Sequence, residues 1–215
     1  TPLLMGISHG DHPRDLIRTI AEEMLTRFDA APLVDKYEAY QRLMSYWAAT
    51  MQDDVFIIAG GGWLAARELR EARKETSDDG KVKWLEEGEL TANRVRLVAD
   101  VIPPALITAR IFAGLKEELD QATGRVEERG REIEDLAEEH GAEGGLFEEL
   151  MADTGKLTAS GVKARLKDKS IEPDEKALLT HVAKLFEDEA EAKRETKEAE
   201  AALTEAVLKK YPTLT

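Results

Sequence analysis

The sequence predicts a mainly α-helical protein, in which N-terminal helices precede a small antiparallel β insert and a long antiparallel coiled-coil-like helical hairpin with a helical tip. Three observations lead to this fold class. Apolar residues recur at helical spacing over the first helices, short β-type runs with turn signals follow, and steps of three and four residues begin after Pro103-Pro104. We therefore expect two regions, residues 1–102 and residues 103–215.

The composition restricts the class of protein. The chain of 215 residues is long enough for one or two domains with a core, and its formal net charge is −14. Because phosphate binding depends on clustered Lys and Arg, this charge argues against a DNA clamp formed by the chain alone. The chain has no cysteine, which excludes disulfide scaffolds and cysteine-rich zinc sites and fits a reducing compartment.

Two further features concern location and extent. The sequence has no run of about 20 apolar residues, so we expect a soluble, cytoplasmic protein without a membrane partner. The chain begins with Thr1-Pro2 rather than with Met. We therefore expect a fragment of a longer protein.

Two amphipathic helices are predicted near the N-terminus. The first has Pro13 in its first turn, and the second begins after Asp35, which can cap it while Glu38 reaches back to complete a capping box. The apolar face of the first helix comprises Leu16, Ile17, Ile20, Met24 and Phe28. The second helix carries a bulky stripe, here called the aromatic packing face, made of Tyr40, Leu43, Met44, Trp47 and Met51. This stripe indicates core packing rather than ligand binding.

The region from about residue 54 to residue 102 changes its period. "VFIIA" is a short apolar β-type run that precedes three glycines, and "SDDGK" is a tight-turn signal. "VKWL" and "VRLVADVI" are further strand candidates. We expect a small antiparallel sheet or hairpins, with a glycine-rich hairpin turn after "VFIIA".

Two helical seams are predicted after Pro103-Pro104, where a helix begins. Each follows steps of three and four residues, and each helix would span roughly 35 residues or ~50 Å. The first seam consists of Phe112, Leu115, Leu119, Ala122, Val126, Ile133, Leu136 and His140, with Arg129 as its polar member. The second seam consists of Leu178, Val182, Leu185, Ala192, Thr196, Ala199, Leu203 and Ala206, interrupted by Glu189.

The equal lengths of these helices and their compact connector favour an antiparallel hairpin. One alternative is that the two solvated helices pack only on each other. The other is that they receive a partner helix, because the apolar seam is thin for its length.

The stretch "DDVFIIAGGGWLAAREL" has the outline of a strand, a glycine-rich turn and a helix, which is the arrangement of a nucleotide site. Such a site also needs a second parallel strand that ends in an acidic residue, and "TSDDGKVKWLEEGEL" supplies a turn instead. Adenine methylation needs Asn or Asp before two prolines and an aromatic residue after them. "IPPA" has Ile102 and Ala105 at those positions. We expect no catalytic residue and no S-adenosylmethionine site in this chain.

Metal binding is also not expected. His9, Asp11 and His12 lie close together in "HGDH", but no third ligand is near in sequence. His140 and His181 fall on the long helices, where we interpret them as structural.

Several longer sequence words occur together here. They are "APLVDKYEAYQRLMSYWAATMQDDVFIIAGGGW" at residues 31–63, "LVADVIPPALITARIF", and the closing "LKKYPTL" beyond the Glu-rich helices. Together they resemble the C-terminal part of the modification (M, methyltransferase) subunit of type I restriction-modification systems, over nearly the whole chain. Relatives have a less glycine-rich turn where this chain has Gly60-Gly61-Gly62, which accounts for the nucleotide-site outline.

The resemblance implies a role in assembly. The parent subunit would be a site-specific adenine DNA methyltransferase that binds S-adenosylmethionine upstream of this chain, with residues 1–102 as the tail of its catalytic core. Two such subunits would join one specificity subunit, and residues 103–215 would dock that subunit. DNA would be contacted only within the complex. The alternative function is a self-contained coiled-coil scaffold or adaptor, although such a scaffold has no need for the aromatic packing face or the β insert.

Overall fold

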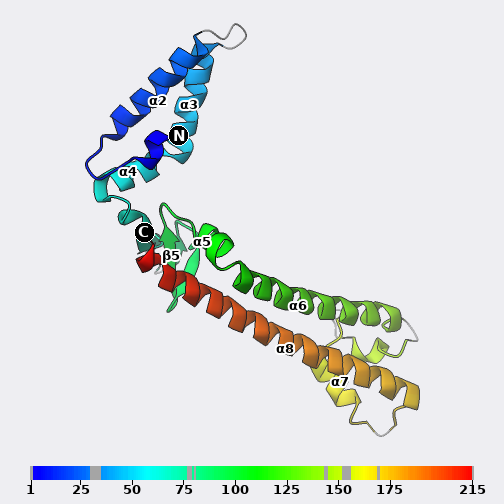
Figure 1. Cartoon of the computed structure of the whole chain (residues 1–215). Coiled ribbons are helices and arrows are strands. Elements are labelled where there is room, and N and C mark those ends of the chain that lie inside the picture. The colour runs from blue at the N-terminus through cyan, green and yellow to red at the C-terminus, as the bar shows by residue number, and fades with distance from the viewer. Residues whose placement is uncertain are drawn as a thin grey trace. The chain divides into compact units, whose positions relative to one another are not determined.

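The structure is a computed structural model that describes residues 2–29, 35–76, 79, 81–142, 145–151, 156–168 and 170–214. The chain divides into two compact units, which are coloured by residue number in Figure 1. The N-terminal unit comprises Thr1–Ile111 together with Thr204–Thr215, and the hairpin unit comprises Phe112–Leu203. The sequence-based boundary at 102/103 therefore differs from the division at 111/112, and the last residues of the chain belong to the N-terminal unit.

The fold is mainly α-helical with a small antiparallel insert and a long C-terminal helix, which confirms the predicted class. The helical part of the N-terminal unit contains α1 (Pro2–Met5), α2 (Pro13–Phe28), α3 (Lys36–Thr50) and α4 (Gln52–Gly61).

The N-terminus of α3 is capped as predicted by Asp35. Its Oδ1 atom accepts hydrogen bonds from the backbone N–H groups of Tyr37 at 2.8 Å and Glu38 at 3.4 Å. The Glu38 carboxylate accepts a hydrogen bond from Arg42 one turn later, at 3.0 Å, rather than completing the capping box. The start of this helix is therefore fixed by one side chain.

The core of the N-terminal unit forms where α3 and α4 meet the segment that precedes α2. Its buried residues are Ile7, Trp47, Val55 and Ile58. The indole Nε1–H of Trp63 donates a hydrogen bond to the Ile7 carbonyl at 2.8 Å. This bond ties the segment after α4 back to the start of the chain.

The prediction of a strand at "VFIIA" is wrong, because these residues belong to α4. Val55, Ile58 and Ala59 are all buried, and their spacing is helical. The last glycine of the run, Gly62, ends the helix at φ 71°, and its N–H donates to the Ile58 carbonyl. A short apolar run does not distinguish a strand from a buried helix. The glycines therefore mark a helix C-terminus and not a hairpin turn.

The β insert has two parts. A three-stranded antiparallel sheet has the order β1 (Leu69–Glu71), β5 (Val95–Ala99), β4 (Leu90–Ala92), and β2 (Lys74–Thr76) pairs with β3 (Val82–Trp84). The strand predictions at "VKWL" and "VRLVADVI" are confirmed by β3 and β5. The residues after Gly62, whose sequence is compatible with a helix, instead form a 3-10 turn, Ala65–Arg67, followed by β1 and β2. Most of the predicted "SDDGK" turn lies outside the described residues.

Side chains hold the insert together. The Glu86 carboxylate accepts hydrogen bonds from Arg70 at 2.7 Å and from the Arg73 backbone N–H at 2.9 Å, and Arg70 also pairs with Asp100 at 2.8 Å. The guanidinium groups of Arg70 and Arg73 hold the pKa of Glu86 well below its usual value.

Trp84 is covered by two cations of the same insert. Arg96 lies 4.9 Å and the Lys74 Nζ atom 5.7 Å from the centroid of its ring. Cations on an aromatic ring shield its apolar surface from water, and they fix the tryptophan within the insert.

The end of the chain is bound to the N-terminal unit. The Tyr211 hydroxyl, in the 3-10 turn Tyr211–Thr213, donates to the Ile102 carbonyl at 2.6 Å, and Arg67 donates to the Pro212 carbonyl at 3.1 Å. Burial raises the pKa of the Tyr211 hydroxyl above its usual value. These contacts explain why residues after Leu203 belong to this unit.

The helices of the second half begin with α5 (Pro104–Ile111), which confirms the predicted start at the two prolines. The helical conformation is interrupted at Phe112, and a second helix, α6 (Ala113–His140), begins directly after it. At the tip lie a 3-10 turn, Glu148–Leu150, and α7 (Ala159–Arg165), and the long helix α8 (Pro173–Lys210) returns beside α6 (Figure 1). Within the described ranges, no helix is both long and apolar enough to cross a membrane.

Candidate assembly surface

The first seam lies along one side of α6. Ala122 and Ile133 are buried, and the members between and beyond them are half-buried. The half-buried members are Phe112, Leu115, Leu119, Val126, Arg129, Leu136 and His140. The seam residues thus form one continuous side of the helix. Most of them retain some access to solvent.

The second seam follows α8 in the same way. Val182, Leu185 and Ala192 are buried, and Leu178, Thr196, Ala199, Leu203 and Ala206 are half-buried. Leu179, which lies outside the predicted seam, is fully buried. Leu179 and Phe186 pack at the tip core beside the seam member Val182, and the heptad pattern missed these two residues.

The helices α6 and α8 are not tightly packed. Few Cα atoms of the two helices lie within 8 Å of each other, so their backbones are not in close contact along most of their length. An ion pair between Arg125 and Glu195, at 2.5 Å, also joins them. The small residues of the second seam therefore do not bring the two backbones into close contact.

The tip contains the main core of the hairpin unit. Phe147, Leu157 and Val162, from the segment between the long helices, pack with Leu179 and Val182 of α8. The ring of His140 meets Phe147 edge-on, with the centroids 5.5 Å apart. The role of His140 is therefore packing, at the end of α6.

An ion pair joins α7 to α8 beneath this core. The Glu175 side chain is buried, and its Oε1 atom accepts a hydrogen bond from Nε of Arg165 at 2.7 Å. Asp168 lies on the other side of the same guanidinium group, at 3.4 Å. A buried carboxylate needs such a partner.

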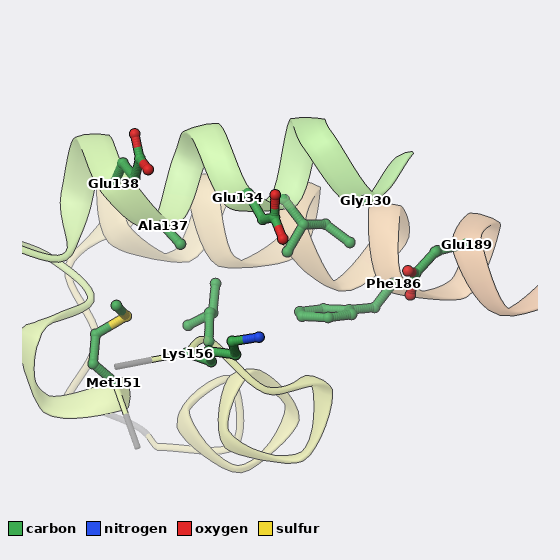
Figure 2. Close-up of a pocket in the computed structure, with 10 residues that line it drawn as sticks. Gly130, Glu134, Ala137, Glu138, Met151, Lys156, Phe186 and Glu189 are labelled. Atoms are coloured by element: carbon green, nitrogen blue, oxygen red, sulfur yellow. The ribbon is translucent and has the colours of Figure 1, made fainter. Parts of the chain in front are cut away.

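A cavity of about 320 Å³ opens beside the tip core (Figure 2). Ile133, Ala137, Leu157 and Phe186 are among the apolar residues that line it. Met151 and Lys156 come from the tip segment, and the remaining lining residues are Gly130, Glu134, Glu138 and Glu189. In Figure 2 the two glutamates Glu134 and Glu138 extend from successive turns of α6.

The aromatic packing face is divided between two environments. Trp47 is buried in the N-terminal core and Met51 packs against it. Leu43 is half-buried, whereas Tyr40 and Met44 line a cavity of about 500 Å³ with residues of α2 such as Ile17 and Leu25. The aromatic packing face therefore lies partly in the core and partly at an open surface. Helical spacing alone does not show this division.

The sequence words that outline a nucleotide site lie at helix ends. The three glycines end α4, and Pro103-Pro104 begins α5. Among the residues that the structure describes, no group of three or more His, Cys, Asp and Glu side chains is placed to hold a metal ion.

Comparisons of the chain with protein-family models, with curated proteins and with solved structures found no match. Its function is therefore inferred from the chain itself.

Proposed function

We propose that the chain is the C-terminal assembly region of the modification subunit of a type I restriction-modification system, and that its hairpin unit docks the specificity subunit. The observation that carries this proposal is the half-covered apolar seam. Leu115, Leu119 and Val126 keep access to solvent although they share one side of α6 with the buried Ala122 and Ile133. Apolar stripes of this kind are typical of helix-in-groove recognition.

The sequence words at residues 31–63 and around Pro103-Pro104 support the same assignment through their resemblance to that family. Their described residues fall mainly on α3 and α4 and on β5 and α5. The parent subunit would then provide S-adenosylmethionine binding and adenine methylation, and a second modification subunit would join the same specificity subunit. DNA would be bound by the assembled complex.

The charge of the hairpin unit favours protein docking over DNA binding. Residues 112–203 contain 14 Lys and Arg against 25 Asp and Glu. Carboxylates in this excess repel phosphate and attract a basic partner.

A self-contained scaffold that only joins copies of itself is the second candidate, because the same seam can receive a helix of another copy. The open part of the aromatic packing face, at Tyr40 and Met44, favours the first candidate. A pure scaffold has no use for this second apolar surface.

The test is capture of the cognate specificity subunit by the 215-residue chain, beside a titration with duplex DNA at ~0.15 M salt. Leu119→Asp should weaken capture by about tenfold or more, since it places a charge in the seam, while Leu146→Asp, at an exposed position of the tip, should not. Helical content by circular dichroism shows that each variant is folded. Tight DNA binding without capture would overturn the proposal, and self-association alone would favour the scaffold.

A further inference from the structure

The cavity at the tip differs from the seams because its wall is apolar and its rim is acidic. Phe186, Ile133 and Leu157 provide apolar surface, and Ala137 adds its methyl group to the same lining. Three carboxylates, those of Glu134, Glu138 and Glu189, lie among the lining residues against one cation, Lys156. The hairpin unit thus presents an apolar hollow with charged groups around it.

We propose that this cavity is an anchor site that receives one large apolar side chain from a basic helix of the specificity subunit. The inference deepens the function proposed above and rests on it. At this place on the hairpin unit a single partner side chain contributes most to affinity. The residues that flank that side chain on the partner helix are basic.

The size of the cavity is sufficient for one large side chain. Its volume of about 320 Å³ lies at the lower limit of small-molecule sites, which span about 300–1,000 Å³. It corresponds to roughly ten water molecules at about 30 Å³ each. Release of this water from apolar walls favours entry of an aromatic or branched side chain.

The rigidity of the wall also fits an anchor site. Leu157 is buried in the tip core, and Phe186 and Ala137 pack against that core. Anchor side chains contribute most to affinity where they enter formed pockets near well-packed residues. The part of the wall formed by Leu157, Phe186 and Ala137 therefore needs little rearrangement on binding.

The charge of the rim identifies the flanking residues of the partner. Glu134 and Glu138 are four residues apart on α6, and the described residues place no Lys or Arg within ion-pair distance of either carboxylate. Glu189 is already paired with Lys193 at 2.7 Å. Two carboxylates on successive helical turns match Lys or Arg side chains on successive turns of a partner helix.

Gly130 offers a way to fill the cavity without disturbing the core. A Cβ atom at this position would have the Glu189 Oε1 atom as its near neighbour, at 3.8 Å, which is an ordinary contact. Gly124 lies on the same helix and is exposed, and a Cβ atom added there would meet no atom within 4 Å. Gly130→Leu and Gly124→Leu therefore make the same change, glycine to leucine, in the same helix. The first lies at the cavity and the second lies outside it.

The experiment measures the affinity of the 215-residue chain for the cognate specificity subunit. Gly130→Leu should lower it about tenfold, and Gly124→Leu should leave it within about twofold of the unchanged chain. The double substitution Glu134→Gln/Glu138→Gln should lower it about threefold at low salt, and Lys156→Gln should raise it. Asp135→Asn/Glu139→Gln, on the same two turns but outside the cavity, is the matched control for charge.

A second readout locates the contact. Met151 is the methionine of residues 112–203, so its ¹³C-labelled methyl resonance, assigned with Met151→Leu, reports on the cavity. The specificity subunit should shift this resonance, and Gly130→Leu should reduce the shift.

Full affinity of the Gly130→Leu chain together with an unshifted Met151 resonance would overturn the anchor site while leaving the proposed function intact. Absence of binding by the unchanged chain would overturn both. Equal effects of Gly130→Leu and Gly124→Leu would also contradict the anchor site, since a general effect on α6 would then explain the loss.

Discussion

The N-terminal unit and the hairpin unit keep their structures in different ways. The hairpin unit has 14 Lys and Arg against 25 Asp and Glu, whereas the rest of the chain has 16 against 19. The N-terminal unit buries a tryptophan and is closed by long-range hydrogen bonds from Trp63, Arg67 and Tyr211. The hairpin unit concentrates its large buried side chains at the tip and leaves its seams half-covered.

This contrast shows where a long hairpin obtains its stability. Two helices that share only a thin seam bury little apolar area for their length. Most of the stability of a helix in a protein comes from such packing and not from helix propensity. The tip core therefore stabilises the hairpin, while the seams remain available for a partner. Substitutions in each unit test this division, beginning with the most destabilising.

Trp47→Ala should destabilise the N-terminal unit by about 4 kcal/mol, because it leaves a cavity in the core that joins α3 and α4. Hydrogen exchange should show faster exchange in α2 to α4, with the tip amides of the hairpin unit unchanged. Tyr46→Ala, at a side chain that is 59% exposed, is the control and should have little effect. Equal loss of protection in both units would show that they unfold as one.

Leu179→Ala should destabilise the hairpin unit by about 3 kcal/mol, since Leu179 is fully buried in the tip core. Leu119→Ala, in the half-covered seam, should cost only about 1 kcal/mol. The comparison is made by urea unfolding followed through helical content. A larger loss for Leu119→Ala would place the stability of the hairpin in its seams.

Glu175→Ala should cost roughly 2 kcal/mol, because it removes the carboxylate that accepts a 2.7 Å hydrogen bond from the partly buried Arg165 guanidinium. Asp174→Ala changes the exposed neighbour in the same turn and is the control. Protection of α7 amides is the measurement. Unchanged protection in the Glu175 variant would mean that apolar packing alone holds α7.

The β insert should lose stability in acid. The pKa of Glu86 is lowered in the folded state, so its carboxylate stabilises the N-terminal unit above the unfolded value of about 4.3, and this contribution is lost as the pH falls through the folded pKa. Glu86→Gln should reduce stability at pH 7 and flatten its dependence on pH below about 4.3. Thermal unfolding between neutral and acidic pH measures both. Glu87→Gln, at an exposed residue, should change neither.

The sequence predicts some elements well for physical reasons that can be named. Steps of three and four residues place Leu119, Ala122 and Val126 on one side of a helix whatever the partner, so the course of α6 follows from the pattern. The cap at Asp35 and the helix start at Pro104 depend only on neighbouring residues, so the sequence predicts them equally well.

Other elements depend on contacts that a local pattern does not contain. "VFIIA" is apolar on every side, and its helical state follows from Val55 and Ile58 meeting Trp47 and Ile7. The break at Phe112, the first member of the seam, divides the helix predicted to start at Pro103-Pro104 into α5 and α6. The cavity beside the tip combines Gly130 and Glu134 with Phe186, which lie far apart in sequence, so it is visible only once the chain has folded.

The places of the aromatic residues have a consequence for observing the molecule. Trp47, Trp63 and Trp84 lie in the N-terminal unit, and residues 112–203 contain neither tryptophan nor tyrosine. Tryptophan emission therefore follows the N-terminal unit alone, with the buried Trp47 as the side chain most sensitive to loss of the core. The hairpin unit is silent in this signal. Helical content reports on both units, so its comparison with tryptophan emission on the unmodified chain distinguishes loss of the N-terminal unit from loss of the hairpin unit without an added dye.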